Sequence, residues 1–322
     1  MSFSSEVKKE LAGQIGNARH CQIAELAALL IFCCVVRATD GGDIHIDYES
    51  EHLDVTEKYV TLLKKLFHIS PEIIVKPDLR RRKKEVYKVN ITDRSLAITI
   101  LQLVRFLSDS EDFAEDVPLA HQVILNRSCC RRAFLRGAFL AAGSVSDPDK
   151  SYHFEIVCTE ENLADQLCEL MVELGIDARR VQRQKYAITY VKGSEQIADL
   201  LGMMEARVMM LQYENSRIIN EVRGNINRKV NCETANINKT ANAAARQIED
   251  IELIENTMGL SKLPNGLDEM ARVRLQYPTA TLSELGDLIN PPVGKSGVNH
   301  RLRKIGEIAE RIRTQGGSIR NG

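Results

Sequence analysis

The feature that most constrains the fold of this chain is an internal repeat at a spacing of about 108 residues. Placing residue 24 over residue 132 aligns an apolar helix, an alternating strand, an amphipathic helix and a further strand. The paired segments are 24–35 with 132–143, 45–47 with 153–155, 59–66 with 167–174, and 86–92 with 186–191. Another helical segment follows in both copies. We therefore expect an α+β domain made of two αββαββα halves related by a pseudo-two-fold axis.

The first helix of the second copy overlaps the segment 134–144 and carries small residues on one face. Gly137, Ala141 and Gly143 leave little side chain on that face. A Gly in a helix interior costs about 1 kcal/mol relative to Ala, and close approach of another backbone can offset this cost. We therefore expect the first helices of the two copies to pack side by side at the centre of the domain.

Residues 135–143 resemble the LAGLIDADG motif of homing endonucleases. The resemblance implies that the residue before the last Gly is an acid that holds a catalytic metal ion in active members. Ala142 occupies that position here, and Cys34 occupies it in the first copy. Because Mg²⁺-assisted cleavage of a phosphodiester needs oxygen ligands, supplied largely by carboxylates, we expect no catalytic residue and no enzyme. The alternative is an active nuclease or maturase, although the nearby acids Asp147 and Asp149 follow the end of the helix.

Histidines and cysteines form no recognisable metal motif in the sequence. His45 and His153 align in the repeat, but neither has a second His or Cys at ligand spacing. The chain has eight cysteines, four of them in adjacent pairs, and no Cys-x-x-Cys. The pairs are Cys33-Cys34 and Cys129-Cys130. This pattern argues against zinc and against a disulfide framework, and it indicates a reducing cytoplasm. We expect no metal and no cofactor.

Charge and hydropathy place further limits on partners and location. The net charge is −1 at pH 7, so a site for nucleic acid must be local. The apolar stretch 23–36 is too short for a membrane span, and the polar segment 2–11 does not resemble a signal peptide. We expect a cytoplasmic, nucleoid-associated protein with no membrane partner.

A polar helical segment at 205–260 is unusually rich in asparagine. The asparagines are Asn215, Asn220, Asn225, Asn227, Asn231, Asn236, Asn238 and Asn242. Asn does not favour helix interiors, so this density indicates side chains that bind backbone groups or phosphates. Arg228 and Lys229 are candidate phosphate contacts within the segment. A solvated connector between domains is an equally good interpretation.

A compact three-helix unit is predicted after the break at 263–266. Its first helix spans 267–277, and a capping box that runs from Thr281 to Glu284 starts the second. Ser296 is expected to cap the third helix, 297–305. Three apolar residues at helical spacing face inward on this helix: Val298, Leu302 and Ile305.

The third helix has the composition of a DNA-recognition helix. Its outward face carries amide, imidazole and basic side chains: Asn299, His300, Arg301, Arg303 and Lys304. In a helix-turn-helix, such side chains reach base edges and phosphates while apolar residues seat the helix. Residues 261–322 contain 10 Lys and Arg against 6 Asp and Glu, a net charge of +4. We expect double-stranded DNA to bind the unit between Thr281 and Arg313.

The densest basic run of the chain lies between two predicted strands. It comprises Arg80, Arg81, Arg82, Lys83 and Lys84. A solvated loop is one interpretation, and a phosphate contact beside the repeated domain is the other. We favour the contact with phosphate, because the sheet faces of this scaffold bind DNA in the active homing endonucleases.

The chain resembles the WhiA family over essentially its whole length. The resemblance rests on the start of the chain at 2–11, the segment 227–240, the repeat pair without acids, and the terminal helix-turn-helix. It implies a DNA-binding protein of Gram-positive-type bacteria, linked to cell division and chromosome segregation. In some lineages it also implies transcription of sporulation genes.

These observations predict the following domains: an N-terminal helix at 1–20, a degenerate LAGLIDADG-like domain at 21–204 with repeats at 21–128 and 129–204, an Asn-rich connector at 205–260, and a helix-turn-helix domain at 261–322. The expected function is that of a non-catalytic DNA-binding transcriptional regulator. A protein-interaction scaffold with secondary DNA contact is the remaining alternative. The target sequence, protein partners and oligomeric state stay open.

Overall fold

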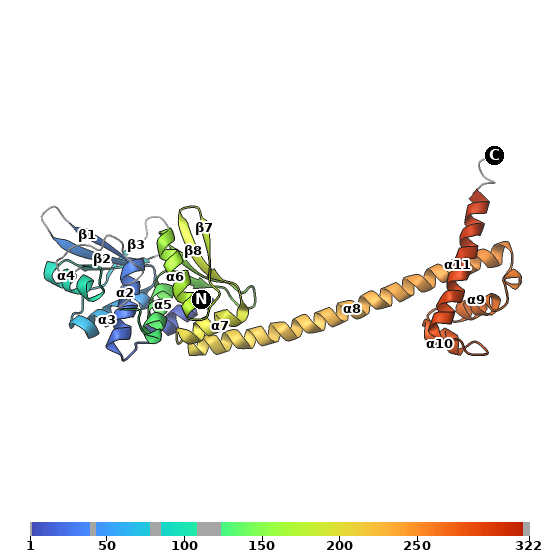
Figure 1. The fold of residues 1–322 in the computed structure, drawn as a ribbon, viewed down its shortest axis with the longest axis horizontal. Coiled ribbons are helices and arrows are strands. Elements are labelled where there is room, and N and C mark those ends of the chain that lie inside the picture. Colours follow the sequence, from blue (N-terminus) through green and yellow to red (C-terminus); the bar gives the residue numbers. More distant parts are fainter. Residues whose placement is uncertain (1, 39–42, 78–84, 108–123, 318–322) are drawn as a thin grey trace. The chain divides into compact units, whose positions relative to one another are not determined.

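The structure is a computed structural model that describes residues 2–38, 43–77, 85–107 and 124–317 (Figure 1). The chain divides into two packed units, Met1–Glu221 and Val222–Gly322. The basic run at 80–84 lies outside the described residues. Within the described residues, no helix is both long enough and apolar enough to cross a membrane.

The first unit contains two copies of an αββαββα motif, as the repeat predicts. The first copy comprises α2 (Arg19–Cys33), β1 (Cys34–Ala38), β2 (Ile44–Ser50), α3 (Leu53–Phe67), β3 (Ile74–Pro77), β4 (Glu85–Ile91) and α4 (Arg94–Leu103). The second comprises α5 (Ser128–Ala142), β5 (Gly143–Val145), β6 (Phe154–Cys158), α6 (Glu161–Glu173), β7 (Arg179–Arg183), β8 (Tyr186–Val191) and α7 (Ser194–Met203).

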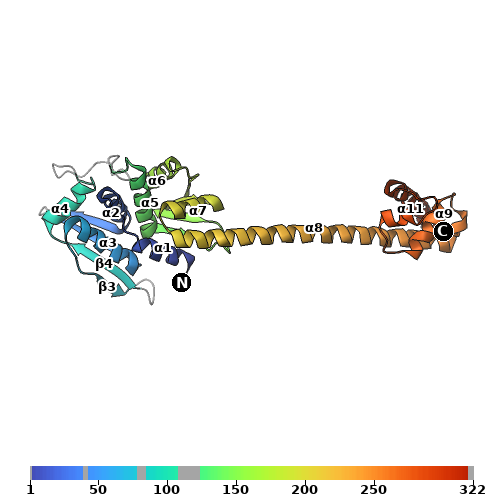
Figure 2. The same cartoon turned by 90° about the horizontal axis from the view of Figure 1, so that it is seen from below.

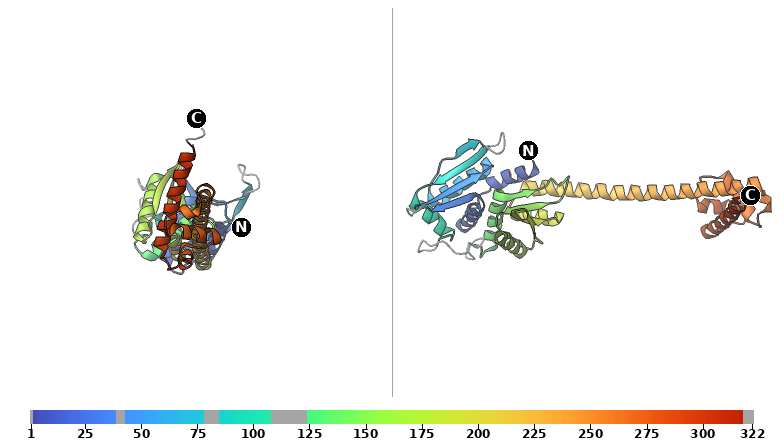
Figure 3. Two further views of the ribbon diagram at one scale, coloured as in Figure 1. Left: turned by 90° about the vertical axis from the view of Figure 1, so that its right-hand side faces the viewer. Right: turned by 90° about the horizontal axis from the view of Figure 1, so that it is seen from above.

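Each copy forms its own antiparallel sheet (Figure 3), and the two sheets have the same strand order. The orders are β1-β2-β4-β3 and β5-β6-β8-β7. Along β2 and β6 buried residues alternate with more exposed ones, because one face of each sheet packs against helices and the other does not. The helices of both copies thus enclose one continuous core, and each sheet leaves an outer face.

The observed ends of α2 and α5 shift the alignment of the two copies by one residue relative to the spacing of about 108 expected from the sequence. The amide of Cys34 donates to the carbonyl of Leu30, and that of Gly143 donates to the carbonyl of Phe139. The counterpart of Ala142 is therefore Cys33, not Cys34. The discrepancy arises because the first copy has one more residue between its first two strands, where Cys34 pairs with Tyr48 but Gly143 pairs with Ile156.

Helices α2 and α5 pack against each other along their length, as expected (Figure 2). Gly137 lies at the point of closest approach. A Cβ atom added there would lie 2.7 Å from the carbonyl oxygen of Glu25 and 2.8 Å from the Cβ of Ala28. Gly137 and Ala28 are equivalent positions in the two copies, so the small residues meet across the pseudo-two-fold axis.

A buried ionic network joins four helices around this contact. Glu25 accepts hydrogen bonds from Arg136 at 2.7 and 3.1 Å and forms a 2.6 Å ion pair with Lys58. Lys58 also donates to the carbonyl of Leu11 at 2.7 Å, and Arg136 donates to Glu205 at 2.8 Å. Buried charges are tolerated when they are paired and hydrogen-bonded in this way.

The N-terminal helix belongs to the repeated domain. Helix α1 (Phe3–Gly13) is capped by Ser2, whose side chain accepts a hydrogen bond from the amide of Ser5. Val7 and Leu11 are fully buried in the core of the first unit.

The remaining elements are α8 (Arg207–Thr257), a short 3-10 helix η1 (Leu260–Lys262), α9 (Leu267–Gln276), α10 (Leu282–Asp287) and α11 (Lys295–Gly317). Ile251 and Ile254 of α8 are fully buried in the core of the second unit, against α9–α11. The boundaries expected at 204/205 and 260/261 therefore differ from the observed division between Glu221 and Val222.

Candidate nucleic-acid interface

Helices α9, α10 and α11 form the expected helix-turn-helix. The capping box at the start of α10 is present: the amide of Glu284 donates to Thr281 Oγ1 at 3.4 Å, and the amide of Thr281 donates to Glu284 Oε2 at 2.7 Å. The turn after α10 folds back tightly, because the amide of Val293 donates to the carbonyl of Gly286 at 3.0 Å. A Cβ on Gly286 would lie only 2.0 Å from the Val293 carbonyl oxygen, so this turn requires glycine.

The third helix differs from the expected one at both ends. The amides of Gly297 and Val298 donate to the carbonyl of Gly294, so α11 begins at Lys295 and Ser296 lies in its first turn. The prediction that Ser296 caps the helix is therefore wrong. The helix also runs to Gly317 instead of ending near Ile305, because Ala309 continues the apolar face into the core.

The inward face of α11 is as expected. Val298, Leu302 and Ile305 are at most 3% exposed and pack in the core of the second unit. These residues recur at i, i+4 and i+7, which places them on one face of the helix. The opposite face is therefore held rigidly at the surface.

That surface carries polar and basic side chains, and some of them form hydrogen bonds or ion pairs within the protein. Asn299, His300 and Lys304 are exposed. Arg303 is exposed and forms an ion pair with Glu307 at 3.3 Å, an i,i+4 contact worth little in water. Arg301 is only half-exposed, since it donates to the carbonyl of Gly266 at 3.4 Å and so braces α11 against α9.

A groove of about 420 Å³ adjoins the start of α11. Its lining includes Lys239 from α8, Lys295 and Asn299 from α11, and Arg274 from α9. Arg274 is buried and its hydrogen bonds go to neutral groups, the side chain of Gln247 and the carbonyl of Ala280. Burial lowers the pKa of Arg274. The groove thus combines cationic and amide groups, which suits a phosphate.

Sequence reasoning missed part of this groove. Lys295 and Arg274 were not singled out, since neither lies on the outward face of the third helix. Lys239 belongs to the Asn-rich segment, and α8 brings it beside the helix-turn-helix. By contrast, Arg228 is exposed on α8 and donates to Asn225 at 2.6 Å, while Lys229 is exposed.

The positions that hold acids in active endonucleases are occupied by side chains without carboxylates. Cys33 and Ala142 end the two central helices, and Cys34 follows directly. Burial raises the pKa of Cys33 to about 12 and that of Cys34 well above its ordinary value, so both thiols stay neutral. Neutral thiols and a methyl group do not supply the hard oxygen ligands that Mg²⁺ requires.

Several charged side chains on the outer faces of the two sheets lie in ion pairs. Arg37 lies 3.0 Å from Asp47 on the first sheet. On the second sheet His153 lies 2.9 Å from Glu155, and Arg183 lies 3.8 Å from the same carboxylate. His45 and His153 lie on different sheets and share no ligand partner. Among the described residues, these two arginines and this histidine therefore each lie beside a carboxylate.

Comparison with known proteins identifies the same order of domains. Family models match in three consecutive blocks: the WhiA N-terminal LAGLIDADG-like domain at residues 19–107, the WhiA LAGLIDADG-like domain at 131–223, and the WhiA C-terminal HTH domain at 226–309. The last block starts well within α8, as does the second packed unit.

Relatives match over nearly the full length. Proteins named "Probable cell division protein WhiA" from Lachnoclostridium phytofermentans and Clostridium acetobutylicum are 46% and 41% identical, over 97% and 98% of this chain and 100% of each relative. The fold also matches the crystal structure of full-length DUF199/WhiA from Thermatoga maritima, with a TM-score of 0.57 and a sequence identity of 27%. This match covers 97% of this chain and 99% of that one. The chain therefore belongs to the WhiA family, with paired LAGLIDADG-like repeats followed by a helix-turn-helix domain.

Proposed function

We propose that this protein is a non-catalytic, double-stranded DNA-binding regulator that reads DNA through α11. The supporting observation is the division of α11 into two faces. Val298, Leu302 and Ile305 seat the helix in the core, while its other face presents Asn299 and Lys304 to solvent. A recognition helix needs both a rigid seat and free polar side chains at its surface.

The roles of the exposed side chains follow from their positions along α11. Asn299 and His300 lie near the N-terminal end, the part that meets base edges in a helix-turn-helix. An Asn can bind adenine through two hydrogen bonds. Arg303 and Lys304 lie further along and are assigned to phosphates, together with Lys295 and Lys239 at the adjoining groove. Arg301 positions the helix through Gly266.

The biological role is inferred from the relatives. They are named as probable cell division proteins, and we place this protein in cell division, with transcription regulation and chromosome segregation as the processes that bound DNA serves. Sporulation applies only to lineages that sporulate. A location in the cytoplasm, at the nucleoid, is part of the same proposal.

Two other functions are less well supported. A nuclease or maturase would need carboxylates where Cys33 and Ala142 stand. A protein-interaction scaffold is favoured only for the repeated domain, whose outer sheet faces pair charges such as Arg37 with Asp47. A scaffold role there is compatible with DNA reading by α11.

The proposal is tested by the salt dependence of DNA affinity in the full chain, because each lost phosphate contact reduces the slope of log K against log salt by about 0.9. Arg303→Ala and Lys304→Ala should weaken binding to a specific and a scrambled duplex alike, with that loss of slope. Lys65→Ala, on an exposed position of α3, is the matched control for charge. Unchanged affinity and slope in both α11 variants would refute the assignment of these residues to phosphates.

A further inference from the structure

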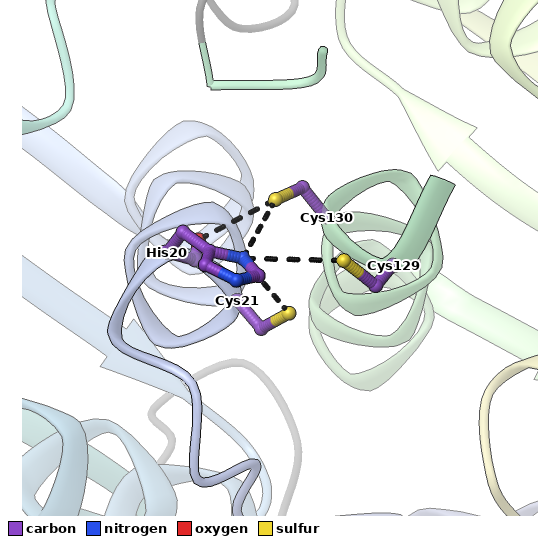
Figure 4. Close-up of side chains that lie close together, drawn as sticks. All are labelled: His20, Cys21, Cys129 and Cys130. Carbon is purple, nitrogen blue, oxygen red and sulfur yellow. Dashed lines mark hydrogen bonds between the residues drawn. The ribbon is translucent and has the colours of Figure 1, made fainter. Parts of the chain in front are cut away.

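Two dipeptides that lie 109 residues apart in the chain meet at one end of the central helix pair. His20 and Cys21 are the second and third residues of α2, and Cys129 and Cys130 hold the same positions in α5. Figure 4 shows the four side chains pointing into the space between the two helices. The pseudo-two-fold axis that relates the repeats thus relates the two halves of this cluster.

The ligand atoms of the cluster are close enough to share one ion. His20 Nδ1 lies 3.2 Å from Cys130 Sγ, 3.3 Å from Cys21 Sγ and 4.0 Å from Cys129 Sγ. All four ligand atoms lie within 4.8 Å of one another. In a tetrahedral zinc site, with Zn–S near 2.3 Å and Zn–N near 2.0–2.1 Å, ligand atoms are roughly 3.5–3.8 Å apart. Small side-chain rotations therefore suffice to close such a site.

The donor set also selects the metal. Three thiolate sulfurs and one imidazole nitrogen form the Cys₃His set of structural zinc sites, which is soft and four-coordinate. Magnesium and calcium prefer oxygen ligands, and the cluster offers none from side chains. Among the described residues, this is the group of His, Cys, Asp and Glu side chains with metal-binding geometry.

We propose that His20, Cys21, Cys129 and Cys130 bind one zinc ion that fastens α2 to α5. The fold, and not local spacing in the sequence, brings these four ligands together, so the site contains no Cys-x-x-Cys. All four coordination positions are filled by protein, so the ion has no open position for water and its role is structural. It fixes the N-terminal ends of the two helices, whereas the degenerate acid positions, Cys33 and Ala142, lie at their other ends.

The first test is the metal content of the full chain, purified without oxygen and with its affinity tag removed. Wild type should carry about one zinc ion per chain, and a Cys129→Ser/Cys130→Ser variant less than about 0.1. Cys232→Ser is the matched control, because Cys232 is exposed on α8 and lies outside the cluster. Wild type that lacks zinc after purification from zinc-supplemented cells would overturn the proposal, as would equal zinc in the double variant.

A second test uses wild type alone, so it does not depend on whether a variant folds. Metal-free protein is titrated with Co²⁺, which should give the visible bands of a tetrahedral ion and a near-ultraviolet thiolate-to-cobalt band. Both should saturate at about one equivalent, and Zn²⁺ should abolish them. No tetrahedral spectrum would overturn the proposal. A disulfide between Cys21 and Cys129 or Cys130, found by mass spectrometry in the protein purified without oxygen, would also overturn it and identify a redox pair.

Discussion

Replacing Gly137 tests whether the central helix contact is as close as the structure places it. The Cβ of an alanine would lie 2.7 Å from the Glu25 carbonyl oxygen and 2.8 Å from the Ala28 Cβ. Carbon atoms pack best at about 3.5–4.0 Å, so α2 and α5 must separate by several tenths of an ångström. Neither neighbouring atom can rotate away, because one is backbone and the other is a Cβ.

The magnitude follows from two opposing effects. Overpacking a core costs about 1–3 kcal/mol, whereas Ala instead of Gly in a helix gains about 1 kcal/mol. Gly137→Ala should therefore lower the free energy of unfolding by up to about 2 kcal/mol, and Gly137→Leu by about 1–3 kcal/mol or more. Gly13→Ala is the control, because Gly13 ends α1 in the same unit and its Cβ would meet nothing within 4 Å.

Urea unfolding followed by tyrosine fluorescence measures this effect selectively. The chain has no tryptophan, and seven of its eight tyrosines precede residue 222, in the first unit. The Gly13→Ala midpoint should equal or exceed that of wild type, and the Gly137→Ala midpoint should fall below it. Equal midpoints for wild type and both Gly137 variants would refute the close helix contact.

Three further predictions concern the ionic network, the capping box and catalysis. Glu25→Ala leaves Lys58 and Arg136 buried without their shared carboxylate and should cost about 3–5 kcal/mol in urea unfolding; a loss under about 1 kcal/mol would contradict the network. Thr281→Ala removes the side chain that caps α10 and should cost about 1 kcal/mol. The backbone amide of residue 281, the main cause of the lowered Glu284 pKa, still donates to Glu284 in this variant, so both proteins should keep a pH dependence. The stabilisation is present above the ordinary carboxyl pKa near 4.5 and falls as pH drops through the lowered value, which acid titration of both proteins by circular dichroism would reveal. Supercoiled plasmid incubated with stoichiometric protein and Mg²⁺ should remain unnicked, and nicking abolished by chelation would show that catalysis survives.

The sequence predicted the architecture well because the repeat carries strong periodic signals. Two αββαββα copies, the packed central helices and the capping box at Thr281 all follow from local patterns. The repeat nevertheless placed Cys34, and not Cys33, opposite Ala142, because an alignment at one fixed spacing does not allow for the extra residue between β1 and β2. The cap assigned to Ser296 was wrong because Gly294 supplies the first helical carbonyl.

Local sequence patterns could not predict which distant residues the fold brings into contact. The cluster of His20 with Cys129 joins segments 109 residues apart, and Arg274 enters the groove only because α8 packs on α9–α11. Conversely, the outward face of α11 was predicted correctly at Asn299 and Lys304, since a seated helix fixes which side chains remain outside. Arg301 was the exception, because it donates a hydrogen bond to the carbonyl of Gly266 and is only partly exposed.

The central claim, that α11 reads DNA sequence, is tested most directly by selecting bound duplexes from a random library with the full chain. Wild type should enrich one motif. Asn299→Ala should still bind DNA but relax the motif at one or two positions, a loss of about 1–3 kcal/mol in discrimination, while Lys65→Ala should select the wild-type motif. Identical motifs from wild type and from Asn299→Ala and His300→Ala variants would contradict the claim and place recognition outside α11.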